Sequence, residues 1–182
     1  FYSYFGGENI DQVSYQAACK NAPHLNQLSG ERIHQEIFKI AAAPYAQEAI
    51  ILMLHGGVWQ NLESGQPDIQ KIRHYRFGKE TVVNLAAVIR ATVNPAEILK
   101  KVANRWRLSR QEEKLLHLLI AVDYTLDNEL NCKKALFYLG SDNLLRYIQC
   151  LEVENPARDF SEAKQLALHY ILPPLPLNGE DL

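Results

Sequence analysis

Two groups of basic residues are the parts of this 182-residue sequence whose types and spacing suggest chemistry. The first group contains Arg73, Arg76 and Lys79, with aromatic residues between them. The second surrounds Trp106 and contains Lys100, Lys101, Arg105, Arg107 and Arg110. Arginine and lysine contact phosphates, and aromatic rings stack on unpaired bases. Both groups are therefore candidate RNA-binding residues.

A second interpretation of the same residues stays open. Charged residues on a helix usually form a solvated face, and Trp106 would then belong to the core. Glu97, Glu112 and Glu113 also dilute the positive charge of the second group. The sequence alone does not choose between the two interpretations.

Motifs for catalysis, metal binding or cofactor binding are not found. Gly6-Gly7 and Gly56-Gly57 are isolated pairs, typical of turns or helix ends rather than of a phosphate-binding loop. Glu31-x-x-His34 has the spacing of half a carboxylate di-metal site, which needs a second copy and two further glutamates on facing helices. No second copy is present, so we expect an exposed polar pair. The sequence predicts no catalytic residue, metal site or cofactor in this chain.

Composition limits the possible classes of protein. Hydrophobic residues make up 47% of the chain, enough for a substantial core. The formal net charge is −2 and the sequence pI is about 6.3, whereas nucleic-acid-binding domains are usually basic. Any RNA site must therefore be a local patch. Three widely spaced cysteines, Cys19, Cys132 and Cys150, predict reduced thiols in a cytoplasmic protein, and no apolar run approaches a membrane span.

Helices must position these residues, because helical periodicity runs through most of the chain. Ser29 has the properties of an N-cap, with Leu28 and Ile33 at hydrophobic-staple spacing. Ser109 and Glu112 form a capping-box pattern. Further helices are predicted after Pro44 up to Gly56-Gly57, from Asp68 to Phe77, over 82–89, after an Asn94 N-cap, over 130–139, after a Ser141 cap, and over 163–170. The prolines in "LPPLPLNGEDL" end regular structure. Because strand signals are scarce, the predicted fold is all-α, an irregular array of short helices.

Several segments also resemble one known family. "LSGERIHQEIFKIAAAPYAQEAIILMLHGGVWQNL" resembles a segment of bacterial class II tRNA nucleotidyltransferases, the CCA-adding enzymes, and of their poly(A) polymerase relatives. "FYSYFGG", "NRWRLSRQEEKLL" and "ILPPLPLNGEDL" are similar to other segments of that family, in the family's order. The resemblance covers nearly the whole chain.

The resemblance implies the helical neck, body and tail of that family. Residues 1–62 would be the end of the neck and the start of the body, 63–140 the helical body, and 141–182 the start of an apparently truncated tail. The family's catalytic head precedes this region, and its motifs are absent here. Magnesium and CTP or ATP would therefore act in the intact enzyme, and this chain alone would not transfer nucleotides.

The leading hypothesis from the resemblance is a tRNA-binding and scaffolding region of a CCA-adding enzyme. Its expected partners are the acceptor stem and T-arm of tRNA, and the catalytic head, in cis or as a separate subunit. One alternative is the same region of a poly(A) polymerase. Another is a helical protein-interaction module that binds no RNA, which would expose an apolar patch instead of a basic groove.

Overall fold

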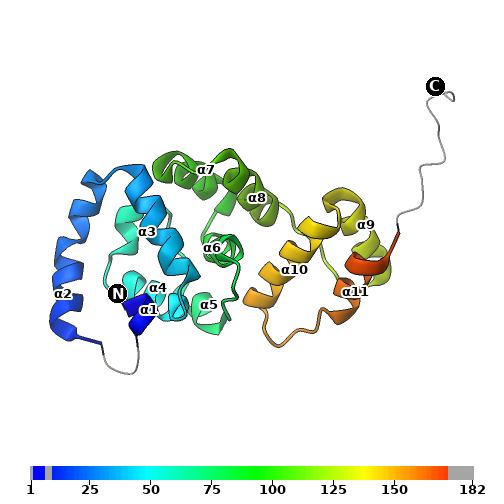
Figure 1. Ribbon diagram of the computed structural model, residues 1–182, viewed down its shortest axis with the longest axis horizontal. Helices are drawn as coiled ribbons and strands as arrows, with labels where there is room; N and C mark the ends of the chain where they lie inside the picture. The colour runs from blue at the N-terminus through cyan, green and yellow to red at the C-terminus, as the bar shows by residue number, and fades with distance from the viewer. Residues whose placement is uncertain (1, 7–9, 172–182) are drawn as a thin grey trace.

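In the computed structural model, which describes residues 2–6 and 10–171, every regular element is a helix (Figure 1). This confirms the predicted all-α class. The α-helices are α1 (Tyr2–Phe5), α2 (Gln12–Asn21), α3 (Gly30–Ala42), α4 (Ala46–His55), α5 (Ile69–His74), α6 (Thr81–Arg90), α7 (Pro95–Trp106), α8 (Arg110–Ala121), α9 (Glu129–Leu139), α10 (Ser141–Glu154) and α11 (Ser161–His169). Two 3₁₀ helices, η1 (Ala22–Gln27) and η2 (Trp59–Leu62), connect them.

Two predicted helix starts are confirmed by their capping bonds. The Ser29 hydroxyl accepts a hydrogen bond from the Arg32 backbone N–H at the start of α3. At the start of α8, Ser109 and Glu112 exchange both bonds of a capping box. Both starts were readable in the sequence because a capping bond joins residues only three positions apart.

Two other predicted boundaries differ, and one confirmed boundary lacks its expected side-chain bond. Helix α5 ends at His74 instead of Phe77, because the Arg76 N–H donates to the Val153 carbonyl of α10 and not to its own helix. Asn94 is the N-cap of α7, as predicted, but its backbone is left-handed, with φ 56°, and its side chain makes no capping bond. Ser141 is the first residue of α10, and Gly140 is the cap. The predicted end of regular structure after residue 171 lies outside the described residues.

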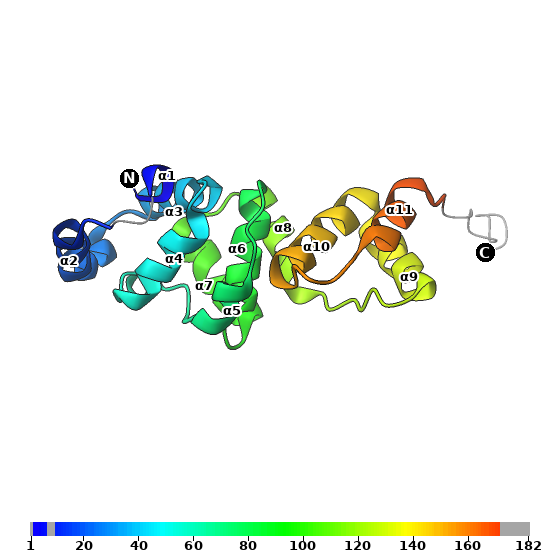
Figure 2. The ribbon, with the colours of Figure 1, turned by 90° about the horizontal axis from the view of Figure 1, so that it is seen from below.

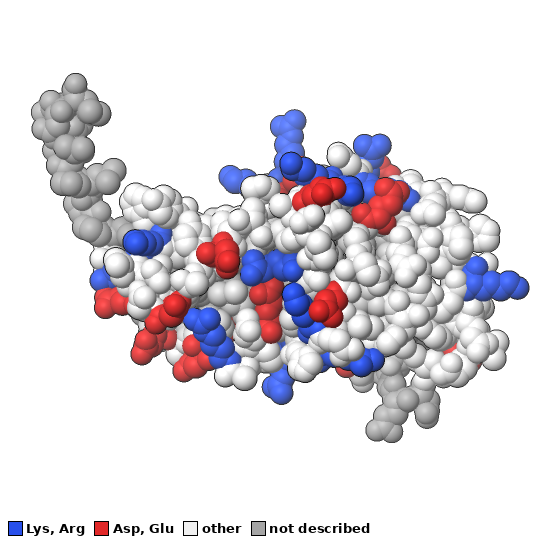
Figure 3. Space-filling view, turned by 180° about the vertical axis from the view of Figure 1, so that it is seen from behind, with Lys and Arg blue, Asp and Glu red and all other residues white. Residues whose placement is uncertain are grey.

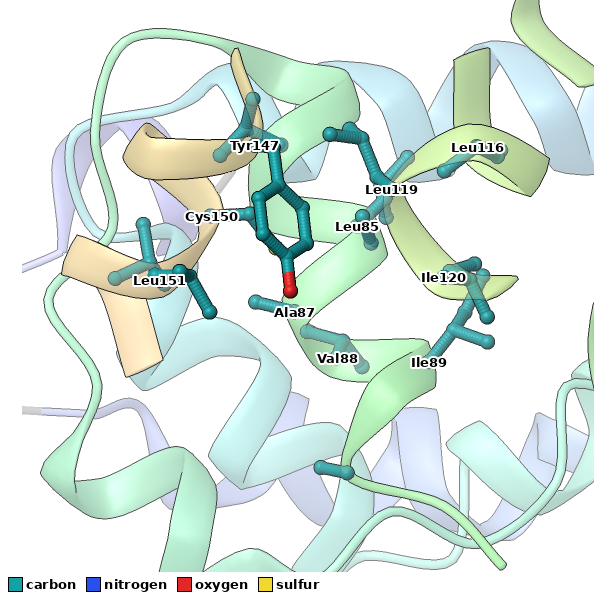
Figure 4. Close-up of a cluster of buried hydrophobic side chains, with 14 of the residues drawn as sticks. Leu85, Ala87, Val88, Ile89, Leu116, Leu119, Ile120, Tyr147, Cys150 and Leu151 are labelled. Carbon is teal, nitrogen blue, oxygen red and sulfur yellow. The ribbon is translucent and has the colours of Figure 1, made fainter. Parts of the chain in front are cut away.

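Helix α6 is the central element of the fold. Its residues Val83 to Ile89 are all buried, and it packs against α3, α7, α8 and α10. Figure 4 shows where apolar side chains of α6, α8 and α10 meet, with the ring of Tyr147 among them. A helix that is apolar nearly all round is expected to be enclosed by other helices, as α6 is.

Helix α10 connects the two ends of an elongated molecule (Figure 2). It packs on α6 and α8 toward the N-terminal end and on α9 and α11 toward the C-terminal end. The hydroxyl of Tyr147 on α10 accepts a bond from the Tyr124 N–H and donates one to the Tyr124 carbonyl, at 3.0 Å and 3.3 Å. These bonds hold the connection between α8 and α9 against α10. The neck, body and tail boundaries at residues 62 and 140 stay a prediction.

Candidate nucleic-acid interface

The first basic group lies at the end of α5 and in the loop that leads to α6. Arg73 is in the last turn of α5, and Arg76 and Lys79 follow it in the loop; all three are exposed. The Nη2 atom of Arg73 lies 3.0 Å from Nε2 of His55, at the end of α4. The three cations therefore occupy one short, exposed segment, which we call the basic loop (residues 73–79).

Two amide side chains, one of α4 and one of α6, hold the basic loop in place. The Nε2 of Gln47 donates to the Ile72 carbonyl at 2.9 Å, near the end of α5. Asn84, buried in α6, accepts a bond from the Gly78 N–H and donates to the Gly78 carbonyl, both at 2.9 Å. Its Nδ2 also donates to the Ala41 carbonyl at 2.9 Å. The backbone under the loop is thus bonded on three sides: to α4, α6 and, through Arg76, α10.

Sequence reasoning missed Asn84 as a positioning residue. Its signal was a single amide within the apolar run "TVVNLAAVI". A buried amide needs hydrogen-bond partners, so a lone asparagine on an enclosed helix indicates backbone groups nearby. The partners themselves, Ala41 and Gly78, cannot be identified from the sequence pattern.

The second basic group follows α7 and the start of α8. Lys100, Lys101, Arg107 and Arg110 are exposed. The Nζ of Lys101 lies 2.9 Å from Oε1 of Glu97, one turn earlier, so part of its charge is neutralised. This group is more diluted by acidic side chains than the basic loop is.

Arg105 is bonded to protein groups on every side. Its Nε lies 3.1 Å from Oε1 of Glu63, and its two terminal nitrogens donate to the Leu28 and Leu25 carbonyls at 3.2 Å. The side chain is 16% exposed. Its donors join α7 to the segment before α3, which is a structural arrangement.

Trp106 is a core residue, as the second interpretation of its group expected. It is completely buried, its Nε1 donates to the Leu62 carbonyl at 2.9 Å, and its ring meets the Trp59 ring edge-on at 6.4 Å. The hypothesis that this indole stacks on RNA bases is therefore wrong. Residues around it reach the surface, but the ring does not.

The start of α3 lies against the turn between α7 and α8. A Cβ built on Gly30 would lie 2.3 Å from the Arg105 carbonyl oxygen and 2.8 Å from Cγ of Arg107, so only glycine fits. The Nε2 of His34 lies 3.0 Å from Oε1 of Glu112 across the same contact. Two of the segments that carry the family resemblance therefore pack on each other. His34 pairs with α8 instead of forming the solvated pair with Glu31 that the spacing suggested.

The structure does not bring the two basic groups together. Figure 1 places α5 and α7 on opposite edges of the N-terminal end of the molecule. Seen from behind, acidic and basic side chains stand next to each other over α7 and α8 (Figure 3). A single continuous basic groove through all eight candidate residues is therefore not present in the described chain. The basic loop is the less diluted of the two surfaces.

A grouped set of metal ligands and a membrane-spanning helix are both absent from the described part of the chain. Within residues 2–6 and 10–171, no three His, Cys, Asp or Glu side chains are grouped so that they could hold a metal ion. In the same part of the chain, no helix combines the length and apolar character needed to cross a membrane.

A known family model matches the first third of the chain, and a known protein matches most of its length more weakly. Residues 9–70 match a family model described as "Probable RNA and SrmB- binding site of polymerase A". A CCA-adding enzyme of Streptococcus mutans serotype c is 26% identical over 173 residues. That match covers 87% of this chain and 41% of the relative, so the chain spans about two fifths of the relative's length. Both matches confirm the predicted resemblance.

The matched segment contains few cations of its own. Residues 9–70 include Lys20, Arg32 and Lys39, against six acidic residues. The segment does, however, supply His55, Gln47 and Ala41, which bond to the basic loop or to the asparagine that holds it. The matched segment thus positions the cations that follow it in the sequence.

Proposed function

We propose that this chain is the RNA-binding and scaffolding region of a CCA-adding tRNA nucleotidyltransferase, on the premise that its resemblance to that family is confirmed. The observation that carries the proposal is the contact between the matched segment and the basic loop. Helix α4 of that segment bonds to Arg73 and to the end of α5, and the loop presents Arg73, Arg76 and Lys79 to solvent.

The proposed partner is the acceptor stem and T-arm of tRNA. Double-helical RNA is recognised mainly through its shape, phosphates and 2′-hydroxyls, so exposed cations on a preformed backbone suit it better than a base-reading motif. The net charge of −2 agrees with a local contact. Lys100, Arg107 and Arg110 would form a second, weaker phosphate contact, whereas Arg105 would act through the fold.

The intact parent would add C, C and A to tRNA in the cytoplasm, using magnesium and CTP or ATP on a catalytic head. The head would be in cis or a separate subunit. A poly(A) polymerase parent is the alternative within the family. The present chain should transfer no nucleotide alone, and its incubation with CCA-less tRNA, magnesium, CTP and ATP tests this. A lengthened tRNA would refute the assignment of catalysis to the head.

The deciding experiment is tRNA binding across a salt series, with duplex DNA of similar size as a control. We expect tRNA to bind more tightly than DNA and to weaken steeply with salt, since phosphate contacts release counterions. The double variant Arg76→Ala/Lys79→Ala should lower the salt slope by about two units. Lys134→Ala/Arg146→Ala removes the same charge from α9 and α10 and should leave the slope unchanged. Equal slopes for both variants would refute the role of the basic loop.

A second candidate function has its own supporting observation. Leu130, Phe137 and Tyr138 of α9 are all more than half exposed, and the Tyr138 ring stacks near that of Tyr124 at 6.5 Å. Large exposed apolar side chains are typical of a protein-binding surface. If this surface pairs two copies of the chain, sedimentation should report a dimer that Tyr138→Asp separates. A monomer at all concentrations would count against that pairing.

A further inference from the structure

A pocket that is open to solvent lies where α5 and the start of the basic loop meet the end of α10. Its volume is about 470 Å³. Six residues line it: Gln70, Lys71, His74, Tyr75, Glu154 and Asn155. The two walls come from parts of the chain about eighty residues apart, so no sequence motif marks the pocket.

Tyr75 contributes a hydroxyl to the lining of the pocket. The residue as a whole is 7% exposed. Burial, and secondly the nearby Glu154 carboxylate, raise the pKa of Tyr75, so the hydroxyl keeps its proton. Because Tyr75 lines the pocket, this protonated hydroxyl can form a hydrogen bond with a ligand there.

The other lining groups have unused hydrogen-bonding capacity too. Nδ1 of His74 lies 2.6 Å from the Gln70 carbonyl, which leaves Nε2 as an acceptor in the neutral ring. Asn155 donates through Nδ2 to the Leu151 carbonyl, which leaves its amide oxygen available. The side chain of Gln70 is exposed. Donors and acceptors are therefore mixed around one concave site, as recognition of a nucleobase edge requires.

The charge near the pocket suits a nucleotide. Oε1 of Glu154 lies 2.6 Å from Nε of Arg90, so the guanidinium compensates the negative charge of this carboxylate. The second carboxylate oxygen remains available as an acceptor. Lys71 is exposed at the pocket, and the Arg76 N–H bonds to Val153, next to the lining residue Glu154. A phosphate could thus meet cations while its base occupies the pocket.

We propose that this pocket holds the base of one unpaired nucleotide of the bound RNA. The carboxylate of Glu154 and the amide oxygen of Asn155 accept hydrogen bonds, so a base with an exocyclic amino group, adenine, cytosine or guanine, fits better than uracil. The inference rests on the proposed RNA binding and adds to it a single-stranded element and a base preference. Phosphates outside the pocket supply the sequence-independent part of the affinity.

The test compares hairpin RNAs that share one stem and differ at the 3′ end: blunt, with an adenosine overhang, or with a uridine overhang. Anisotropy titrations of the full chain should give about three- to tenfold tighter binding of the adenosine overhang than of the other two. Tyr75→Phe and Gln70→Ala should abolish that advantage without weakening the blunt hairpin. Both variants preserve packing, because Phe keeps the ring and Gln70 is exposed. Asn104→Ala, on the exposed surface of α7, is the matched control and should bind as the wild type does.

Failure of this inference is distinguishable from failure of the proposed function. Equal binding of blunt and adenosine-overhang hairpins by the wild type would overturn the pocket assignment and leave RNA binding intact. If Tyr75→Phe lowered the affinity for the blunt and the adenosine-overhang hairpins equally, the pocket assignment would also be overturned. Equal affinity for the two overhangs would overturn the base preference. AMP could also displace the overhang RNA when added at the same concentration as the RNA. That result would show that the pocket binds a free nucleotide and would overturn its assignment to RNA. Absence of binding by every hairpin at low salt would overturn both proposals.

Discussion

The Nε atom of Arg90 lies 2.6 Å from Oε1 of Glu154, and this ion pair joins the end of α6 to the end of α10. The two side chains are 17% and 12% exposed. The same guanidinium donates from Nη1 to the Leu119 and Val122 carbonyls at 3.0 Å and 3.3 Å. Arg90 thus connects the central helix to the end of α8 and to one wall of the proposed pocket.

Removal of the Arg90 side chain should destabilise the chain strongly. Arg90→Ala leaves Glu154 without its cation and two carbonyls without their donor, so we expect a loss of about 3 kcal/mol in the free energy of unfolding. Urea denaturation measures it. The control is Lys101→Ala, whose pair with Glu97 is more than half exposed and should cost under about 1 kcal/mol. Similar losses in the two variants would contradict the role given to Arg90.

Replacement of Asn84 should loosen the basic loop. Asn84→Ala removes three hydrogen bonds and leaves the Ala41 and Gly78 groups unpaired, with an expected loss of about 2–3 kcal/mol. Hydrogen exchange should accelerate first at the Gly78 amide, which donates to Asn84. The exposed Asn104 again offers the comparison, since Asn104→Ala should leave both stability and exchange unchanged. Unaltered exchange at Gly78 in Asn84→Ala would show that other contacts hold the loop.

Two glycine substitutions should differ sharply in effect. Gly30→Ala would place a methyl group 2.3 Å from the Arg105 carbonyl oxygen, so α3 must move away from α7. We expect a loss of about 2–3 kcal/mol. Gly78→Ala is the control, because a Cβ there meets no atom within 4 Å. Thermal unfolding of the two variants gives the comparison. Equal melting temperatures would mean that the contact between α3 and α7 is loose.

Glu112 should contribute to stability above acidic pH. Burial opposes ionisation of Glu112, but the hydrogen bonds that it accepts from Ser109 and His34 outweigh burial and lower its pKa. A carboxyl whose pKa is lower in the folded state stabilises fully above its unfolded pKa, about 4.3, and loses this contribution as pH falls through the folded value.

The stability difference between wild type and Glu112→Gln should therefore be largest near neutral pH and shrink below about pH 4. Urea unfolding at several pH values measures it, with Glu48→Gln on the exposed surface of α4 as the reference. A difference that stays constant down to acidic pH would refute the contribution of the ionised carboxylate.

Local signals in the sequence predicted most of the helices. The caps at Ser29 and Ser109 were predictable because the bonds that define them join neighbouring residues. The end of α5 was not, since it depends on the Val153 carbonyl of α10. The start of α7 after Asn94 was predicted correctly, but the left-handed backbone of Asn94 leaves its side chain without the capping bond that its type favours.

The candidate site was predictable only as a set of cations. Sequence spacing grouped Arg73, Arg76 and Lys79 correctly in one exposed segment. It could not separate the exposed Arg107 from Arg105, whose carbonyl partners lie 77 and 80 residues away. The pocket formed by α5 and α10 was equally invisible, because tertiary packing alone brings its walls together.

The two hydrogen bonds between Tyr147 and Tyr124 have a mechanical consequence. Together with the Arg90 bond to Val122, they anchor the chain between α8 and α9 at successive points, so this connection cannot serve as a hinge. These bonds hold the far end of α9 at a fixed separation from the basic loop. A partner that contacted both would have to match that separation with its own shape.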